Sequence, residues 1–178
     1  LNQKTTTDVR WMPLREWDES SGGGVHNPAR WREITTQALK GEPCVLGLDL
    51  SQKIDITALV AVFPPHGSRD WWCVLPWFWV PGDNARKRER ADRVPYAAWA
   101  REGFVEMTGG NWVDYEPIKA RVRACCDQFD VRELAYDPWG AEAIGQDLER
   151  DGMVICRVRQ GVASLSEPMK EMYGQVLA

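Results

Sequence analysis

Two aspartates stand where a divalent cation could bind. Asp49 lies near the end of the apolar run 44–50, and Asp137 follows directly on the run 131–136. Carboxylate oxygens are hard ligands that suit Mg²⁺ or Mn²⁺. If the two runs form parallel neighbouring strands, both acids emerge at the same edge of a sheet, where open α/β sheets place their sites. Two carboxylates so close would repel each other unless a cation lay between them, so the pair predicts a metal site.

Each acid also has a purely structural interpretation. An aspartate at the end of a strand often caps a turn or a helix, and Asp137 precedes Pro138. Asp55, six residues after Asp49, is either an accessory metal ligand or a side chain that braces the turn. Ser51 could donate a hydrogen bond near the site, although serine is common in turns.

Other chemistries find little support in the residues. His26 and His66 have no ligand spacing, which argues against a zinc site and against a Ser-His-Asp triad. The sequence contains no GxxxxGK[ST] and no GxGxxG, so no nucleotide-binding loop is expected. Five cysteines without a CxxC pair fit reduced, buried thiols better than a disulfide framework.

The elements that would position the acids follow from the hydrophobic periodicity. Residues 1–42 are expected to form a connecting arm with one short helix at 28–39, and residues 43–178 one domain. Strands are predicted at 44–50, 56–63, 71–80, 131–136 and 153–158, with a brief extended piece at 104–107. Helices are predicted at 86–100, at 115–129 with Asp114 as N-cap, at 141–150 and at 166–177. The order predicts an α/β fold: a mixed sheet in which an antiparallel three-stranded meander is followed by parallel α/β crossovers, with helices on both faces.

The charge of the chain constrains its partners. Twenty-two Lys and Arg against 26 Asp and Glu give a formal net charge of −4, which excludes a basic nucleic-acid coat protein. One window is basic, because Arg86, Lys87, Arg88, Arg90 and Arg93 oppose only Glu89 and Asp92. We expect this basic cluster to contact a DNA backbone; the alternative is a solvated helix face. No apolar run reaches the roughly 18 residues of a membrane helix, so no membrane contact is expected.

Several short motifs resemble one family when read in order. They are Gly47-Leu48-Asp49-Leu50-Ser51, Asp55-Ile56-Thr57-Ala58-Leu59, Ala135-Tyr136-Asp137-Pro138-Trp139-Gly140-Ala141 and the tail from Arg159 to Lys170. Together with the opening residues 1–3, Trp11 and Trp17, they resemble the nuclease domain of tailed-bacteriophage terminase large subunits.

The resemblance implies a ribonuclease-H-like fold and a two-metal endonuclease that cuts concatemeric double-stranded viral DNA into genome lengths. Asp49 and Asp137 would then be metal ligands for Mg²⁺ or Mn²⁺, Asp55 an accessory ligand, and the third catalytic acid would lie beyond Ala178. Residues 1–42 would lead from an ATPase domain missing from this sequence. The implied partners are DNA, the portal protein, the terminase small subunit and that ATPase domain, and the implied location is the host cytoplasm.

Two alternatives remain open. Another ribonuclease-H-like nuclease of the resolvase or integrase type would use the same acids, but the arm and the Ser166-Glu167-Pro168-Met169-Lys170 segment argue against it. A catalytically idle docking module of the packaging motor would use the same acids only to cap turns.

Overall fold

The computed structural model describes Arg15 and residues 28–51, 56–83, 85, 89 and 94–177. The chain divides into two compact units, one formed by Asn27–Arg159 and one by Leu1–His26 with Gln160–Ala178. In the second unit, the structure describes helix α7 (Val162–Leu177). None of the helices in the described ranges is long and apolar enough to cross a membrane.

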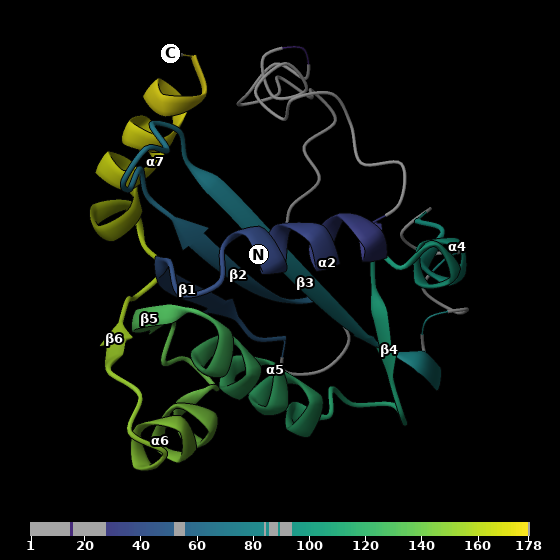
Figure 1. The fold of residues 1–178 in the computed structure, drawn as a ribbon. Helices are drawn as coiled ribbons and strands as arrows, with labels where there is room; N and C mark the ends of the chain where they lie inside the picture. Colours follow the sequence, from purple (N-terminus) through teal and green to yellow (C-terminus); the bar gives the residue numbers. More distant parts are fainter. Residues whose placement is uncertain are drawn as a thin grey trace. The chain divides into compact units, whose positions relative to one another are not determined.

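The unit Asn27–Arg159 is built on a six-stranded mixed sheet of order β4-β3-β2-β1-β5-β6 (Figure 1). The strands are β1 (Pro43–Asp49), β2 (Thr57–Phe63), β3 (Cys73–Pro81), β4 (Glu106–Thr108), β5 (Asp130–Tyr136) and β6 (Ile155–Arg157). β1, β2 and β3 form an antiparallel meander, whereas β1–β5, β5–β6 and β3–β4 are parallel pairs. The predicted α/β fold with a mixed sheet is therefore confirmed.

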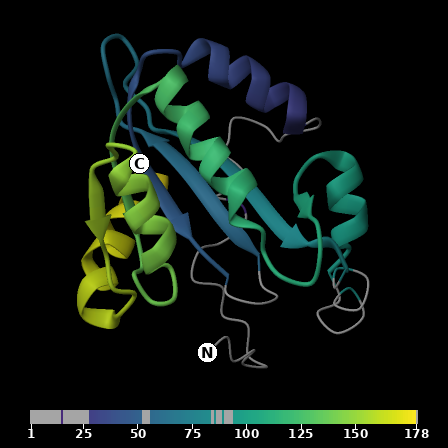
Figure 2. The ribbon, with the colours of Figure 1, turned by 90° about the horizontal axis from the view of Figure 1, so that it is seen from below.

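Three helices cover one face of this sheet, which we call the covered face. They are α2 (Pro28–Ala38), α5 (Tyr115–Gln128) and α6 (Glu142–Arg150), and Figure 2 shows α5 lying over the strands. Every second strand residue points to this face, as in Leu46, Leu59 and Leu134, all of which are fully buried. Ile118 and Val122 of α5 meet them at helical spacing. This core fixes how β1 and β5 lie side by side.

The opposite face is packed mainly at one end. There α4 (Tyr96–Glu102) contributes Tyr96 to a small buried cluster with Val80, Ala85 and Val105. Elsewhere on this face, β1 and β2 present half-buried residues such as Val45 and Val60. Helices thus lie on both faces, as predicted.

Two predicted helices have wrong boundaries. The helix predicted at 86–100 is not continuous: Val94 and Pro95 are non-helical and α4 begins at Tyr96. Proline restrains the residue before it away from helical geometry, which explains this break. α7 begins at Val162 and not at 166, so Pro168 lies inside the helix and outside its first turn.

Two details of the sheet were not predicted. The piece expected at 104–107 is β4, which joins the sheet as a parallel edge strand against Trp79, Val80 and Pro81 only. Pro76 therefore lies on the part of β3 that β4 leaves uncovered. A register shift between Cys44 and Val45 also interrupts the β1–β5 pairing.

Candidate active site at the ends of β1 and β5

The parallel pairing of β1 and β5 brings Asp49 and Asp137 to neighbouring positions. Leu48 is the register partner of Tyr136; the next residues are Asp49, which ends β1, and Asp137, which follows the last residue of β5. Adjacent strands lie about 4.8 Å apart, so the two backbones pass close together at this point. The expectation that the two strands are parallel neighbours is confirmed.

Asp49 and Asp137 lie at the same end of the sheet. Leu48 and Tyr136 are buried on the covered face. Asp49, the next residue of β1, therefore points the opposite way, and Asp137 follows β5 at the same end of the sheet. Asp49 is exposed and Asp137 half-buried, so both acids can meet a solvated ligand without being buried in a core. We call this place the acidic edge.

Asp137 organises the turn that follows it. One of its carboxylate oxygens accepts a hydrogen bond from the Trp139 N–H at 3.0 Å. The Ala141 N–H then donates to the Pro138 carbonyl at 3.3 Å, and Gly140 takes a positive φ of 72°, which favours glycine. Asp137 therefore caps the turn, as its structural interpretation predicted. The same carboxylate can also bind a cation.

The exit from β1 is anchored to its neighbours. The buried Ser51 donates its backbone N–H to the Thr57 hydroxyl oxygen at 3.1 Å. The Tyr115 hydroxyl of α5 donates to the Ser51 carbonyl at 3.3 Å. These bonds hold the backbone beside Asp49, so Thr57 and Tyr115 are supporting residues that the sequence analysis missed. A polar residue such as Thr57 at a buried position of an apolar strand was the available signal.

Behind Asp137, Tyr136 fixes helix α6 to the end of β5. Its hydroxyl donates to a Glu142 carboxylate oxygen at 3.3 Å, and Arg157 contacts the other oxygen at 3.3 Å. The Arg157 bond lowers the pKa of Glu142, and burial raises the pKa of Tyr136. The ring lies so close to Gly145 that a Cβ there would stand 2.0 Å from the tyrosine oxygen. This helical position therefore requires glycine, which the helical pattern alone could not reveal.

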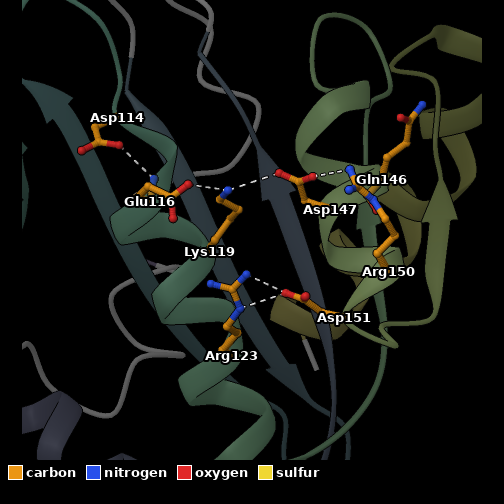
Figure 3. A network of polar contacts seen from close by, with 8 residues as sticks. All are labelled: Asp114, Glu116, Lys119, Arg123, Gln146, Asp147, Arg150 and Asp151. Carbon is orange, nitrogen blue, oxygen red and sulfur yellow. Dashed lines mark hydrogen bonds and ion pairs between the residues drawn. The ribbon is translucent and has the colours of Figure 1, made fainter.

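An ion-pair network joins α5 to α6 (Figure 3). Lys119 contacts Glu116 at 2.5 Å and Asp147 at 3.2 Å, and Arg123 contacts Asp151 at 2.6 Å. The Glu116 bond is the main cause of the raised pKa of Lys119. These two cations bind the neighbouring helix, and the network holds in place the helix that begins just after Asp137.

Five predicted site residues lie outside the described residues: Asp55, Arg86, Lys87, Arg88 and Arg90. The strands next to them in the sequence are described. Asp49 is the register partner of Ala58, and Thr57 that of Trp79, so β3 ends at the level of the acidic edge. The basic cluster follows β3 in sequence. Within the described ranges, no group of three or more His, Cys, Asp or Glu residues gathers as a metal site.

A separate hollow of about 340 Å³ lies beside the outer edge of β3. Arg32 and Arg121 line it, with Trp77 beneath the Arg121 guanidinium at 5.6 Å from the ring centroid. Burial, and next the charge of Arg121, lower the pKa of Arg32. Glu106 is the one acid in its lining, so the acidic edge is the better place for a divalent cation.

Comparison with known proteins places this geometry in a family. The family described as "Terminase large subunit, endonuclease domain" matches residues 2–177. The chain belongs to this terminase endonuclease family. The resemblance found in the short motifs is therefore confirmed, and so is the ribonuclease-H-like class of the fold.

Relatives of this nuclease domain are known in sequence and in structure. It is 30% identical over 163 residues to the terminase large subunit of Enterobacteria phage HK97, covering 90% of this chain and 29% of that protein. It is 28% identical over 147 residues to protein YmfN of Escherichia coli K12, covering 79% and 32%. The crystal structure of the HK97 bacteriophage large terminase superposes with a TM-score of 0.66 at 29% identity, covering 80% of this chain and 31% of that one. The chain thus spans about a third of the length of these relatives.

Proposed function

We propose that this nuclease domain is a divalent-metal-dependent endodeoxyribonuclease that cuts concatemeric double-stranded viral DNA into genome lengths. Asp49 and Asp137 hold Mg²⁺ or Mn²⁺ in this proposal. The observation that supports it is the parallel β1–β5 register, which pairs Leu48 with Tyr136, the residues directly before the two acids.

The donor set fits such an ion. Two carboxylates from adjacent strands supply hard, negatively charged oxygen ligands, and magnesium usually takes one or two carboxylates and keeps several waters. A bound cation would supply Lewis-acid activation of water and neutralisation of charge on the phosphodiester. Asp55, on the segment just before Ile56, is proposed as an accessory ligand. A further acid beyond Ala178 is proposed to complete a two-ion site.

The protein's own groups supply position and charge. Ser51, Thr57 and Tyr115 hold the backbone beside Asp49, and Tyr136 with α6 holds the backbone beside Asp137. The basic cluster Arg86, Lys87, Arg88 and Arg90 is proposed to bind the DNA backbone without reading sequence. It follows a strand that ends level with the acids.

The wider assembly is also a proposal. Residues 1–42 would connect an ATPase domain to the nuclease domain at 43–178. The same large subunit would act with the portal protein and the terminase small subunit in the host cytoplasm. The relatives' greater length leaves room for such a domain.

Plasmid cleavage by the full-length protein tests the proposal. Activity should require Mg²⁺ or Mn²⁺ and disappear in chelator. Asp49→Asn and Asp137→Asn should each lower the rate by more than about 100-fold, because loss of even an outer-shell partner of a metal site costs up to that much. Asp130→Asn is the matched control, since Asp130 begins β5 at its other end and pairs with Arg132.

Circular dichroism should show the same fold in all three variants. Full cleavage by both site variants would contradict the nuclease assignment of these acids and favour a docking module in which they only cap turns.

A further inference from the structure

The turn that follows Asp137 displays a tryptophan to solvent. Trp139 is 83% exposed, compared with 62% for Trp112 and 57% for Trp71. Within the part of the chain that the structure describes, most large aromatic side chains lie in or against the core, as Trp77 and Trp79 do. Nothing in the described fold therefore accounts for the placement of this indole.

The turn keeps the indole near the acidic edge. Trp139 is two residues from Asp137, so their Cα atoms are at most about 7 Å apart. The Trp139 N–H bond to the Asp137 carboxylate and the positive φ of Gly140 define the turn from both sides. The turn thus holds the Trp139 backbone close enough to Asp137 for the exposed indole to reach DNA bound at the acidic edge.

We propose that Trp139 is a stacking subsite for a nucleobase or its sugar next to the scissile phosphodiester. The inference rests on the proposed function, because the DNA backbone must lie at the acidic edge for a base to arrive there. Aromatic side chains stack on any base, and apolar wedges inserted between base steps open a duplex locally. Flexible pyrimidine–purine steps open most easily, so the subsite favours cleavage at TA and CA steps.

The structure separates this role from a role in holding Asp137. The bond to Asp137 comes from the backbone N–H, which every substitution except proline retains. Removing the indole therefore tests stacking while the carboxylate keeps its partner. If Trp139 acts only through its backbone N–H, truncating its side chain causes no loss of DNA affinity.

The test measures binding of a short fluorescein-labelled duplex by anisotropy, in the full-length protein carrying Asp49→Asn so that the DNA is not cut. Trp139→Ala should weaken binding by roughly 5- to 150-fold, the range for loss of one stacked base. Trp139→Phe should stay within about 3-fold, because a ring face remains. The slope of log affinity against log salt should not change, since no phosphate contact is lost.

Trp71→Ala is the matched control. Trp71 is exposed too, but it lies beside Arg69 in the β2–β3 connection, at the other end of the sheet. Its removal should leave affinity unchanged. Equal DNA affinity of Trp139→Ala and the parent protein would overturn the subsite. A loss of affinity in Trp71→Ala, or in a well-folded Trp139→Phe, as large as that in Trp139→Ala would also overturn it.

A second measurement distinguishes a failure of the stacking subsite from a failure of the proposed nuclease function. In the protein with an intact Asp49, Trp139→Ala should reduce the preference for pyrimidine–purine steps while cleavage still requires metal. An unchanged step preference would contradict the wedge. Failure of the parent protein to cut in Mn²⁺ would refute the proposed function, whereas a weaker binding of Trp139→Ala would then still support an aromatic DNA contact.

Discussion

The covered face and the acidic edge of the sheet are held by different forces. On the covered face, Leu46, Leu59 and Leu134 are fully buried under α5, so packing fixes each residue from many sides. At the acidic edge, Asp49 is exposed and the turn after Asp137 is defined by a few hydrogen bonds. The contrast teaches that this fold places its acids through the strands and leaves their side chains accessible. Substitutions in the two regions should accordingly affect different properties.

The largest effect on stability is expected at the centre of β5. Leu134→Ala removes a fully buried side chain, so it should lower the free energy of unfolding by about 2–5 kcal/mol. Asp137→Asn, three residues further along, should change it by less than about 0.5 kcal/mol. Urea denaturation followed by circular dichroism measures both. Equal losses would mean that the acidic edge is as tightly packed as the core.

The contact between Tyr136 and Gly145 should come next. Gly145→Ala forces a methyl group against the tyrosine ring and should cost about 1–3 kcal/mol. Replacing Tyr136 with Leu in the same protein should remove part of that loss, because the clashing ring is absent. A double-mutant cycle by urea denaturation gives the coupling. If the two changes are simply additive, the ring does not set the distance between α6 and β5.

A smaller effect is expected at the start of α5. The Asp114 carboxylate accepts a hydrogen bond from the Glu116 N–H at 3.0 Å, so Asp114→Ala should cost about 0.5–2 kcal/mol. Asp114→Ser should restore most of the stability, since serine is also a good N-cap. Thermal unfolding would rank the stabilities of the parent protein, Asp114→Ser and Asp114→Ala. A neutral alanine variant would show that packing alone determines where α5 begins.

The smallest effect concerns the pH dependence of stability. Arg157 lowers the folded pKa of Glu142 below its unfolded value of about 4.3. The resulting stabilisation is complete above that value and disappears as the pH falls through the folded pKa. Glu142→Gln should therefore unfold with a shallower pH dependence in the acid range, as measured by urea midpoints. If the urea midpoints of Glu142→Gln and the parent protein change with pH in the same way, the Glu142 carboxylate does not contribute to the pH dependence of stability.

The sequence predicted the parts of this molecule that periodicity governs. The three meander strands, the helix after Asp114 and the strand before Asp137 were placed within two residues, because apolar spacing and caps act locally. The helix break at Pro95 could have been predicted from the sequence, but the basic run before it favoured one long helix.

The features that could not be predicted from the sequence depend on contacts between distant segments. Gly145 is required only because Tyr136 lies against it, and β4 becomes a strand only because β3 offers an edge. The proximity of Asp49 and Asp137 could be expected from topology, but the Trp139 bond to Asp137 could not, since a turn's hydrogen bonds depend on its dihedral angles. The metal-binding role of the two acids stays a prediction.

Pro76 gives the sheet a further property. It lies in the middle of β3, on the stretch that β4 does not pair with, and proline has no N–H to offer another strand. An open strand edge is otherwise a template on which a second molecule can extend the sheet. A proline at this position removes one of the backbone donors that a second molecule would need to extend the sheet.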